Sequence, residues 1–465
     1  MRFKLTEVLQ ATAGTLLSPR ADDPLLTAVA IDSRTVSPGE LFVALRGQNH
    51  DAHDFVVEAL SRGAQVAVVD HAIGSADATR LVVVGDTLKA LGDLAAASRA
   101  QSAMKVVAIT GSNGKTTTKE MVAAICNAAT WPPPLQRVLK TEGNLNNLIG
   151  LPLTLLRRKG DEAVGVLEMG MNQPGEIARL TEIARPDFGV VLNVGRAHLQ
   201  GVGGLAGVAA AKGELFEGLP SHAVIAVNID DPWVVKIAEK FAGRKIHFGS
   251  RGEVQAGSIV DFGLDGVAFD LIIEGVREKV RLRAIGQHNV QNALAAAAIA
   301  HAMDLPIAAI VKGLHDSSPP PMRMQVERLG NGMIVLNDSY NANPSSVEAA
   351  LEALRRIPGR AVVVLGAMWE LGDEGRRAHR EIGERVASLG PDLLVTIGDL
   401  GEDIAAGALG AGMTDAVVRV CATHREAADA VLENRRAGDV VLVKGSRGMK
   451  MEEVIRLIRG ATGVR

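Results

Sequence analysis

The feature that most constrains this chain is the stretch VVAITGSNGKTTTKE, which begins at Val106. An apolar strand here runs into a glycine-containing turn, residues 111–117, and a helical segment follows. In such a turn glycines let backbone N–H groups point at an anion, and the start of the helix adds its positive end. The usual phosphate-loop pattern has a glycine five residues before Gly114, whereas this chain has Ile109 there. The sequence therefore predicts a phosphate-binding loop of a shortened kind.

Individual side chains of this turn suit a nucleotide and a metal ion. Lys115 can reach terminal phosphates, and the hydroxyl of Thr116 suits Mg²⁺. The alternative is a turn that merely joins a strand to a helix, but Gly-Lys-Thr directly after an apolar strand favours phosphate binding. The residues expected to bind ATP here are Gly111, Ser112, Asn113, Gly114, Lys115, Thr116 and Thr117.

Length and composition limit the other functions that the chain can have. Its 465 residues exceed what one core usually organises, so two or three domains are expected. A net charge of −3 and an aromatic content of 3% argue against nucleic acid and anionic membranes as partners. The two cysteines, Cys126 and Cys421, have no metal-like spacing. With no signal-peptide pattern and no membrane-spanning segment, we expect a cytoplasmic protein, monomeric and without membrane insertion.

The order of apolar and helical segments predicts an α/β fold in three domains. Residues 1–100 hold short strand-like runs, helical segments and no phosphate loop. In residues 101–316, apolar strands alternate with helices, as in a mainly parallel sheet covered on both faces, and residues 253–285 resemble added antiparallel strands. The proline-rich segment 315–324 is typical of a linker, and further strand–helix units fill residues 317–465.

Polar residues follow several strands of the predicted central domain. Glu168 ends the apolar run AVGVLEM, and in open α/β sheets ligands bind beyond the carboxyl ends of strands. A carboxylate there, beside a phosphate loop, is a natural Mg²⁺ ligand. His198 follows another strand, and Lys212 lies among alanines in a helical segment. For these two, the residues alone favour an incidental histidine and a solvated lysine.

Three later segments combine a strand end or a helix start with polar side chains. NDSYNANPSS follows a strand, so Asp338 could bind a nucleotide or a phosphate-bound water, although turns rich in Asn and Asp are common without function. GQHNVQNALAAAA places His288, Asn289 and Asn292 in the first turn of a helix, where asparagine caps explain part of the pattern and all three side chains suit an adenine edge as well. Two cations of VKGSRGMKME, Lys444 and Arg447, suit a carboxylate or a phosphate.

Taken together, the motifs resemble those of the Mur ligases, in the same order and over essentially the whole chain. This family has a UDP-binding domain, a central ATPase and a C-terminal Rossmann-like domain, and its phosphate loop also lacks the early glycine. Within it, DSR at 32–34, LFVALRGQNHDAHDF at 41–55 and YNANP resemble the members that add D-alanyl-D-alanine to UDP-N-acetylmuramoyl-tripeptide. The six family motifs are TGSNGKTTT, EMGMNQPGEI, GRAHLQGVGG, AAKGE, GQHNVQNALAAAA and NDSYNANPSS.

The resemblance implies that ATP phosphorylates a carboxylate, with two Mg²⁺ ions, and that an amine then displaces the phosphate. It implies Lys115, His198 and Lys212 as catalytic residues, with Lys212 carbamylated by carbon dioxide. Mg²⁺ would be held by Thr116, Glu168, His198 and Lys212. Further ATP contacts would come from Asn289, Asn292, Arg323 and Asp338. The substrate would meet Ser33, Arg34, Thr141, Asn144, Asn147, Tyr340, Lys444 and Arg447.

Positions 52, 171, 200 and 337 depart from the usual family pattern and are expected to affect substrate fit rather than reaction type. Two alternatives stay open. A sister ligase would add one amino acid to a shorter muramoyl peptide, or glutamate to a folate. The folate enzymes begin close to their phosphate loop, whereas about 100 residues precede it here. The Asn-Pro-Arg motif typical of the ligase that adds the third residue is absent from the sequence. A phosphate-loop NTPase without ligase activity would hydrolyse ATP without needing an amine acceptor.

Overall fold

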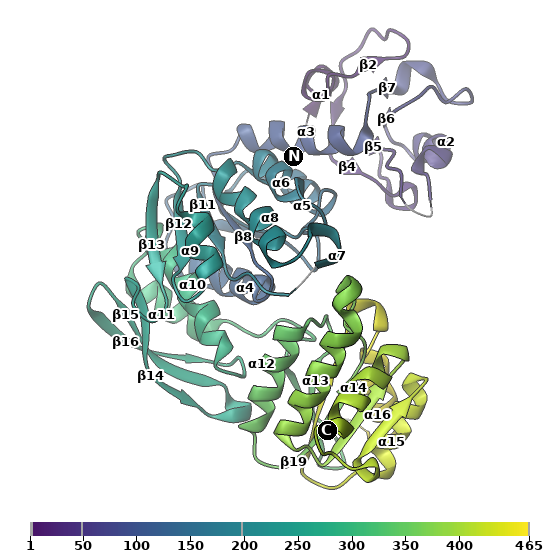
Figure 1. Cartoon of the computed structure of the whole chain (residues 1–465). Coiled ribbons are helices and arrows are strands. Elements are labelled where there is room, and N and C mark those ends of the chain that lie inside the picture. Colours follow the sequence, from purple (N-terminus) through teal and green to yellow (C-terminus); the bar gives the residue numbers. More distant parts are fainter. Residues whose placement is uncertain (1–2, 48–49, 197–198, 464–465) are drawn as a thin grey trace.

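The computed structural model of the chain describes residues 3–47, 50–196 and 199–463. The described helices and strands form an N-terminal, a central and a C-terminal body (Figure 1). Each body is built around one larger sheet, of five, nine and six strands in that order. The predicted three-part α/β organisation is confirmed, while the domain boundaries after residues 100 and 316 stay a prediction.

The N-terminal body has a mostly parallel sheet of short strands. Their order is β2-β7-β6-β5-β4, and only the pairing of β2 with β7 is antiparallel. The strands β1 and β3 pair with each other in a separate, two-stranded antiparallel sheet. The elements of this body are β1 (Phe3–Lys4), α1 (Leu5–Thr12), β2 (Thr15–Leu16), β3 (Leu25–Leu26), β4 (Val29–Ala30), β5 (Leu41–Val43), α2 (Val56–Ser61), β6 (Val66–Val69) and β7 (Leu81–Val83).

Helix α3 (Thr87–Ala100) joins the first two bodies. The side chain of Asp86 accepts a backbone hydrogen bond from the first turn, which fixes where the helix starts. Leu91 is fully buried in a hydrophobic cluster that extends into the central body. The guanidinium of Arg99 donates to the carbonyl oxygen of Ala184, 2.9 Å away. The helix is therefore packed against the central body and is not a free tether.

The central body continues the chain with a nine-stranded sheet. Its elements are β8 (Lys105–Thr110), α4 (Lys115–Ala128), β9 (Arg137–Lys140), α5 (Gly150–Leu156), β10 (Glu162–Glu168), α6 (Glu176–Ala184), β11 (Phe188–Val191), α7 (Leu199–Val202), α8 (Leu205–Gly218), β12 (Val224–Asn228), α9 (Pro232–Ala238), β13 (Arg244–Phe248), β14 (Val254–Asp261), β15 (Val267–Ile273), β16 (Val276–Leu282), α10 (His288–Ala302) and α11 (Ile307–Asp316).

Strands of this sheet lie in the order β16-β15-β14-β13-β12-β11-β8-β10-β9. The six strands β8–β13 are parallel, and β14–β16 are the antiparallel addition that the alternating sequence predicts. Side chains of β8 alternate between two cores: Val106 packs on one face of the sheet, and Val107 packs on the other with α4 and α10. Both faces are covered, which explains why these strands are apolar throughout.

The C-terminal body has a six-stranded sheet in the order β17-β18-β22-β19-β20-β21, antiparallel only at β17. Helices α12, α13 and α14 cover one face, and α15 and α16 the other. The elements are β17 (Gln325–Arg328), β18 (Ile334–Asp338), α12 (Pro344–Arg355), β19 (Arg360–Leu365), α13 (Gly375–Leu389), β20 (Leu393–Ile397), α14 (Asp399–Gly410), β21 (Val418–Cys421), α15 (His424–Glu433), β22 (Asp439–Lys444) and α16 (Glu452–Thr462).

Neither cysteine forms a disulfide, and both are buried. Burial raises the pKa of the Cys126 thiol to about 12, so this thiol stays protonated and unreactive, as expected of a structural residue. Within residues 3–47, 50–196 and 199–463, every helix is too short or too polar to span a bilayer.

Candidate active site

The predicted phosphate loop joins β8 to α4, and its shape depends on Gly114. This residue has φ +84° and precedes the first turn of α4. A Cβ atom at this position would lie 2.2 Å from Oδ1 of Asn292, which belongs to α10. The ammonium of Lys115 donates to the carbonyl oxygen of Gly111, 2.7 Å away, and so curls back over the loop. Desolvation lowers the pKa of Lys115, against the opposing effect of Glu168.

Gly114→Ala is expected to weaken ADP binding by at least about tenfold, because Asn292 must move and the loop must change shape. The left-handed backbone adds a strain of about 1–2 kcal/mol. Gly175→Ala is the matched control, since Gly175 has φ +88° at the start of α6 but open space around its Cβ position. Calorimetric titration with ADP checks both variants. Equal ADP affinities of the two variants would contradict the predicted clash.

A carboxylate lies directly beside the loop, as the strand order requires. Glu168, at the end of β10, is 2% exposed, and its Oε2 accepts a hydrogen bond from the Thr116 hydroxyl at 3.0 Å. Its other oxygen accepts from the amide of Asn146 at 2.9 Å. Arg323 reaches across from the segment before β17 and donates to the Thr116 hydroxyl at 2.9 Å. A carboxylate and a hydroxyl are the oxygen donors that Mg²⁺ prefers, so these residues fit the ion.

Lys212 lies inside the central body, on α8, and is 1% exposed. No hydrogen bond or ion pair joins it to any residue that the structure describes. Burial, and then repulsion from Lys115, lower the pKa of Lys212 well below the usual value of a lysine. The solvated lysine favoured by the residues alone is therefore wrong. His198, the other predicted catalytic residue on this side, lies outside the described residues.

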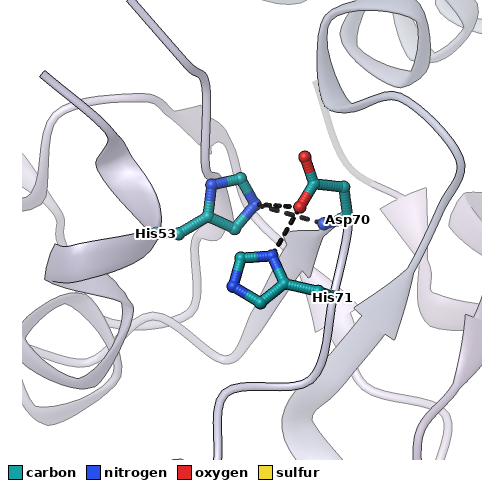
Figure 2. Close-up of side chains that lie close together, drawn as sticks. All are labelled: His53, Asp70 and His71. Atoms are coloured by element: carbon teal, nitrogen blue, oxygen red, sulfur yellow. Dashed lines mark hydrogen bonds and ion pairs between the residues drawn. The ribbon is translucent and has the colours of Figure 1, made fainter. Parts of the chain in front are cut away.

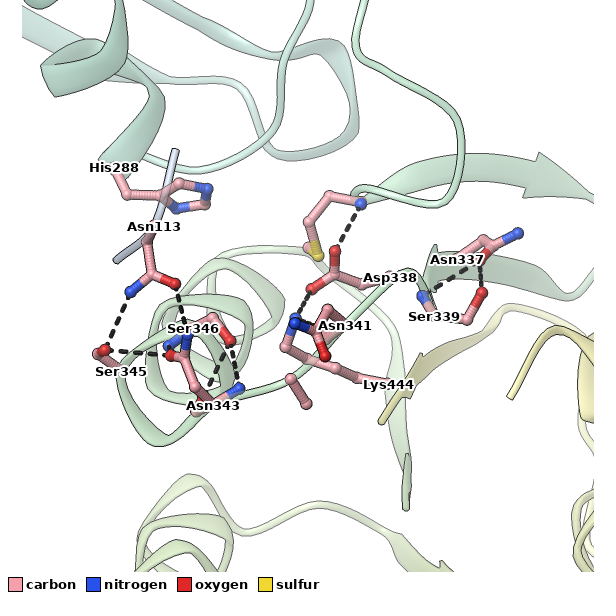
Figure 3. Close-up of polar contacts among 12 residues, drawn as sticks. Asn113, His288, Asn337, Asp338, Ser339, Asn341, Asn343, Ser345, Ser346 and Lys444 are labelled. Carbon is pink, nitrogen blue, oxygen red and sulfur yellow. Dashed lines mark hydrogen bonds and ion pairs between the residues drawn. The ribbon is translucent and has the colours of Figure 1, made fainter. Parts of the chain in front are cut away.

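The C-terminal body also contacts the phosphate loop at Asn113. The amide of Asn113 donates to the hydroxyl of Ser345 at 3.0 Å, and its Oδ1 accepts from the amide of Asn343 at 2.8 Å (Figure 3). Asn343 also caps α12, because its Oδ1 accepts from the backbone N–H of Ser346 at 2.9 Å. The turn that starts α12 thus holds the phosphate loop as well, which joins two segments about 230 residues apart.

Two of the residues predicted to bind ATP or substrate form an ion pair with each other. Lys444, at the end of β22, lies 2.5 Å from Oδ2 of Asp338, at the end of the adjacent strand β18 (Figure 3). Asp338 also accepts from the backbone N–H of Met324, and Lys444 also donates to the carbonyl oxygen of Asn341. The prediction placed Asp338 on ATP and Lys444 on the second substrate. In the structure both border the same cavity as one buried ion pair.

This cavity, of about 460 Å³, lies between the central and C-terminal bodies. Its volume is typical of small-molecule sites. The predicted residues on its wall are Asn113, Gly114, Thr117, Asn289, Asn292, Arg323, Asp338 and Lys444. His288, at the start of α10, also lines the cavity, beside Asn289 and Asn292. Among the wall residues that sequence reasoning missed are several that lie at or just after strand ends: Asn193, Asn228, Asp230, Asp231 and Phe248.

The remaining predicted substrate residues fall in two places. Tyr340 lies beside the site, with the Arg323 guanidinium 4.2 Å and that of Arg447 6.0 Å from its ring centre. In the segment before α5, the buried hydroxyl of Thr141 accepts from the backbone N–H of Glu168. In that segment Asn144 is exposed, and the side chain of Asn147 caps α5 by accepting from backbone N–H groups at its start. The unpredicted Asn146 is the one that contacts Glu168.

Ser33 and Arg34 lie in the N-terminal body and do not line the cavity. The Ser33 hydroxyl donates to Glu58 on α2 at 3.2 Å. Arg34 is largely exposed and donates to Asp32, which lowers the pKa of that carboxyl to about 2. Their geometry therefore leaves the Arg34 guanidinium accessible to an anion.

A second polar cluster of the N-terminal body has the residue types of a metal site (Figure 2). Nδ1 of His53 is 2.6 Å from Asp51, and its Nε2 accepts the backbone N–H of Asp70 at 3.1 Å. The Asp70 carboxylate also meets His71 at 2.6 Å and the Arg46 guanidinium at 2.9 Å. Because Arg46 already supplies a cation to the carboxylate, the cluster is a network that fastens the loop after β5 to the end of β6.

Comparisons with known proteins agree with this geometry. The Mur ligase middle domain matches residues 109–300, the Mur ligase glutamate ligase domain 322–447, and the catalytic domain of the Mur ligase family 25–99. The UDP-N-acetylmuramoyl-tripeptide--D-alanyl-D-alanine ligase of Escherichia coli is 38% identical over 441 residues, 94% of each chain. The Bacillus subtilis enzyme of that name is 34% identical over 452 residues, 97% of this chain and 96% of that one.

Solved structures show the same likeness over the whole length. A crystal structure of MurF from Acinetobacter baumannii superimposes with a TM-score of 0.91 and 33% identity, over 99% of both chains. The MurF ligase from Thermotoga maritima in complex with ADP gives a TM-score of 0.82 and 28% identity, over 93% of this chain and 97% of that one.

Proposed function

The chain belongs to the Mur ligase family, an ATP-dependent ligase family, and from this premise we propose the reaction that it catalyses. It joins D-alanyl-D-alanine to UDP-N-acetylmuramoyl-tripeptide in the synthesis of peptidoglycan precursors, as a monomer in the cytoplasm. The observation that carries this proposal is the contact between Arg323 and Thr116, which brings a cation from the C-terminal body onto the phosphate loop beside Glu168.

The chemistry explains why the site brings cations together. A carboxylate is a poor electrophile, so a carboxylate oxygen of the tripeptide first attacks the γ-phosphorus of ATP; ADP leaves, and an acyl phosphate forms. The neutral amine of the dipeptide then attacks the carbonyl carbon, its nitrogen loses a proton as the amide bond forms, and phosphate leaves with the electrons of the broken C–O bond. Lys115 and Arg323 offset the negative charge that builds up when the carboxylate approaches the phosphate.

Thr116 and Glu168 would hold one Mg²⁺ ion, which supplies further charge neutralisation at the phosphates when bound. Thr116 already contacts Glu168, so little movement of these side chains is needed. In the proposed site His198 and Lys212 help to hold a second ion. That role requires Lys212 to react with carbon dioxide: its nitrogen forms a bond to carbon, a proton leaves, and an anionic carbamate results. The burial of Lys212 and its lowered pKa support this step, because only the neutral amine can attack carbon dioxide.

The positions of the other predicted residues support the proposal that different parts of the UDP-linked substrate bind to different bodies. Ser33 and the accessible Arg34 would bind the uridine diphosphate at the N-terminal body. Thr141, Asn144 and Asn147 precede α5 in the central body, on the segment that contacts Glu168, and would meet the muramoyl part.

The residue that binds the dipeptide carboxylate should be a cation that is still available to an added anion. Lys444 is paired with Asp338, whereas the guanidinium of Arg447 is about half exposed even though it contacts Glu452. Arg447 is therefore the better of the two predicted residues to receive this carboxylate, and Tyr340 lies beside it.

The decisive measurement is phosphate release from ATP by the purified protein with Mg²⁺ and UDP-N-acetylmuramoyl-tripeptide. We expect release with D-alanyl-D-alanine as acceptor and little with D-alanine, L-lysine or glutamate alone. Mass spectrometry should find the pentapeptide product. Release with a single amino acid would assign the chain to a sister ligase. Release that ignores every acceptor would leave an NTPase without ligase activity.

A further inference from the structure

One large aromatic side chain of the C-terminal body is exposed next to the proposed site. Trp369 follows β19, and 48% of its surface is open to solvent. Its ring packs against Gly448: a Cβ atom there would lie 1.9 Å from Cζ3 of the indole. Its backbone N–H donates to the buried hydroxyl of Ser446 at 2.8 Å. The base of the residue and one side of its ring are therefore fixed, while much of the indole remains free.

The backbone beside Trp369 is strained. Glu370 has φ +66°, a left-handed conformation that costs a non-glycine residue about 1 kcal/mol or more. Such strain persists only where the surrounding structure enforces it, and it is frequent at ligand sites.

A continuous row of contacts leads from Trp369 to the phosphate loop. Gly448 adjoins Arg447, whose guanidinium lies 6.0 Å from the ring centre of Tyr340. Arg323 lies 4.2 Å from the same ring centre and donates to Thr116. Through Gly448 and its neighbour Arg447, Trp369 is thus connected to the side chains that contact the expected phosphate and metal position.

The same loop borders the central body. The short helix η5 (Gly372–Glu374), three residues after Trp369, contacts α7 of the central body. Nearby, Arg196 of the central body forms an ion pair with Glu381 of α13 at 2.9 Å. In Figure 1 the start of α13 lies just below α7, at the boundary between the two bodies. An acceptor that approaches the phosphate loop along the row of contacts would pass this loop.

We propose that Trp369 forms a wall of the acceptor subsite and packs on the methyl side chains of D-alanyl-D-alanine, next to the Arg447 guanidinium that binds its carboxylate. This assignment rests on the proposed function. The indole supplies apolar surface of a size that suits two small side chains. Gly448 is required behind it, since any side chain there would displace the ring. Trp369 is thus a residue that sets acceptor affinity and not one that takes part in phosphoryl transfer.

Steady-state kinetics of the full chain test this subsite. Trp369→Ala is expected to raise KM for D-alanyl-D-alanine about tenfold, with KM for ATP and for UDP-N-acetylmuramoyl-tripeptide changed by less than about twofold. Trp369→Phe should restore most of the affinity because it keeps an aromatic wall. Trp233→Ala, which removes a tryptophan of α9 in the central body, is the matched control and should leave all three constants unchanged.

A binding measurement gives a second readout that keeps the native residue. The chain has three tryptophans, so a Trp131→Phe/Trp233→Phe variant leaves Trp369 as the sole indole. D-alanyl-D-alanine, added with UDP-N-acetylmuramoyl-tripeptide and a non-hydrolysable ATP analogue, should shift its emission to shorter wavelength as water leaves the ring. Free D-alanine should cause a much smaller shift.

The outcomes separate this inference from the function on which it rests. If the wild type releases phosphate with the dipeptide, but KM for the dipeptide is unchanged in Trp369→Ala and the emission does not shift, the subsite assignment is wrong and the function stands. If the wild type does not use the dipeptide at all, the proposed function fails first. A uniform rise in all three KM values would also overturn the assignment, because it would indicate a general effect on closure of the bodies.

Discussion

Lys212→Ala is expected to lower kcat for dipeptide-dependent phosphate release by about a thousandfold or more, the scale of losing one electrostatic group in a closed site. The wild-type lysine is 1% exposed and has no described ion-pair partner, so an unmodified ammonium would be an uncompensated buried cation next to Lys115. A carbamate removes that repulsion and provides an anionic ligand. Stopped or coupled assays of phosphate release at saturating substrates measure the effect.

Chemical rescue distinguishes a missing ligand from a damaged fold. Short carboxylic acids such as acetate or propionate should restore part of the activity of Lys212→Ala, since they place a carboxylate in the vacated space. Lys236→Ala, on the surface helix α9, serves as a control and should behave as wild type with and without acid. Retention of wild-type kcat by Lys212→Ala would contradict the proposed role outright.

Carbamylation also predicts a pH dependence with a definite sign. The lowered pKa of Lys212 means that the neutral, reactive amine persists to lower pH than in an exposed lysine. Activity in buffer depleted of carbon dioxide should fall as the pH drops through that pKa, and added bicarbonate should restore it.

The phosphate loop could be predicted from sequence because its determinants are local. An apolar strand, a glycine with positive φ and a lysine at the start of a helix occupy one short segment, residues 106–117. Glu168 was also predictable, because β10 pairs with β8 in parallel and the two strands end at the same edge. The same reasoning at the end of β22 pointed to Lys444, which borders the cavity, while its predicted contact with the substrate stays a prediction.

The sequence did not allow us to predict which side chains of the site contact each other. Three asparagines lie within four residues before α5, and nothing local distinguishes Asn146, which binds Glu168, from Asn147, which caps the helix. The contact of Asn113 with Asn343 depends on how two bodies close, which no pattern within either body encodes. The cavity residues Asp230 and Phe248 likewise depend on the strand order of the central sheet.

The pairing of Asp338 with Lys444 could not be predicted from the sequence either, and we expect its loss to have a large effect on stability. Lys444 is 3% exposed and donates to Asp338 and to one backbone carbonyl. Asp338→Ala leaves this ammonium without a counter-charge, and breaking a buried pair in this way costs about 3–5 kcal/mol. We therefore expect the C-terminal body to unfold at clearly lower urea concentration. Emission of Trp369 in the Trp131→Phe/Trp233→Phe background follows that body alone, because Trp369 is its one tryptophan.

A double-mutant cycle separates the cost of the unpaired charge from the value of the pair. Asp338→Ala/Lys444→Met removes both charges and should recover most of the stability that Asp338→Ala loses, because apolar replacement of a buried pair is often nearly neutral. Asp429→Ala, which breaks the exposed pair with Arg425 in α15 of the same body, is the matched control and should barely move the transition. If Asp338→Ala were as stable as the wild type while KM for the dipeptide rose steeply, Lys444 would be a substrate ligand after all, and the ion pair would be a feature of the unliganded site only.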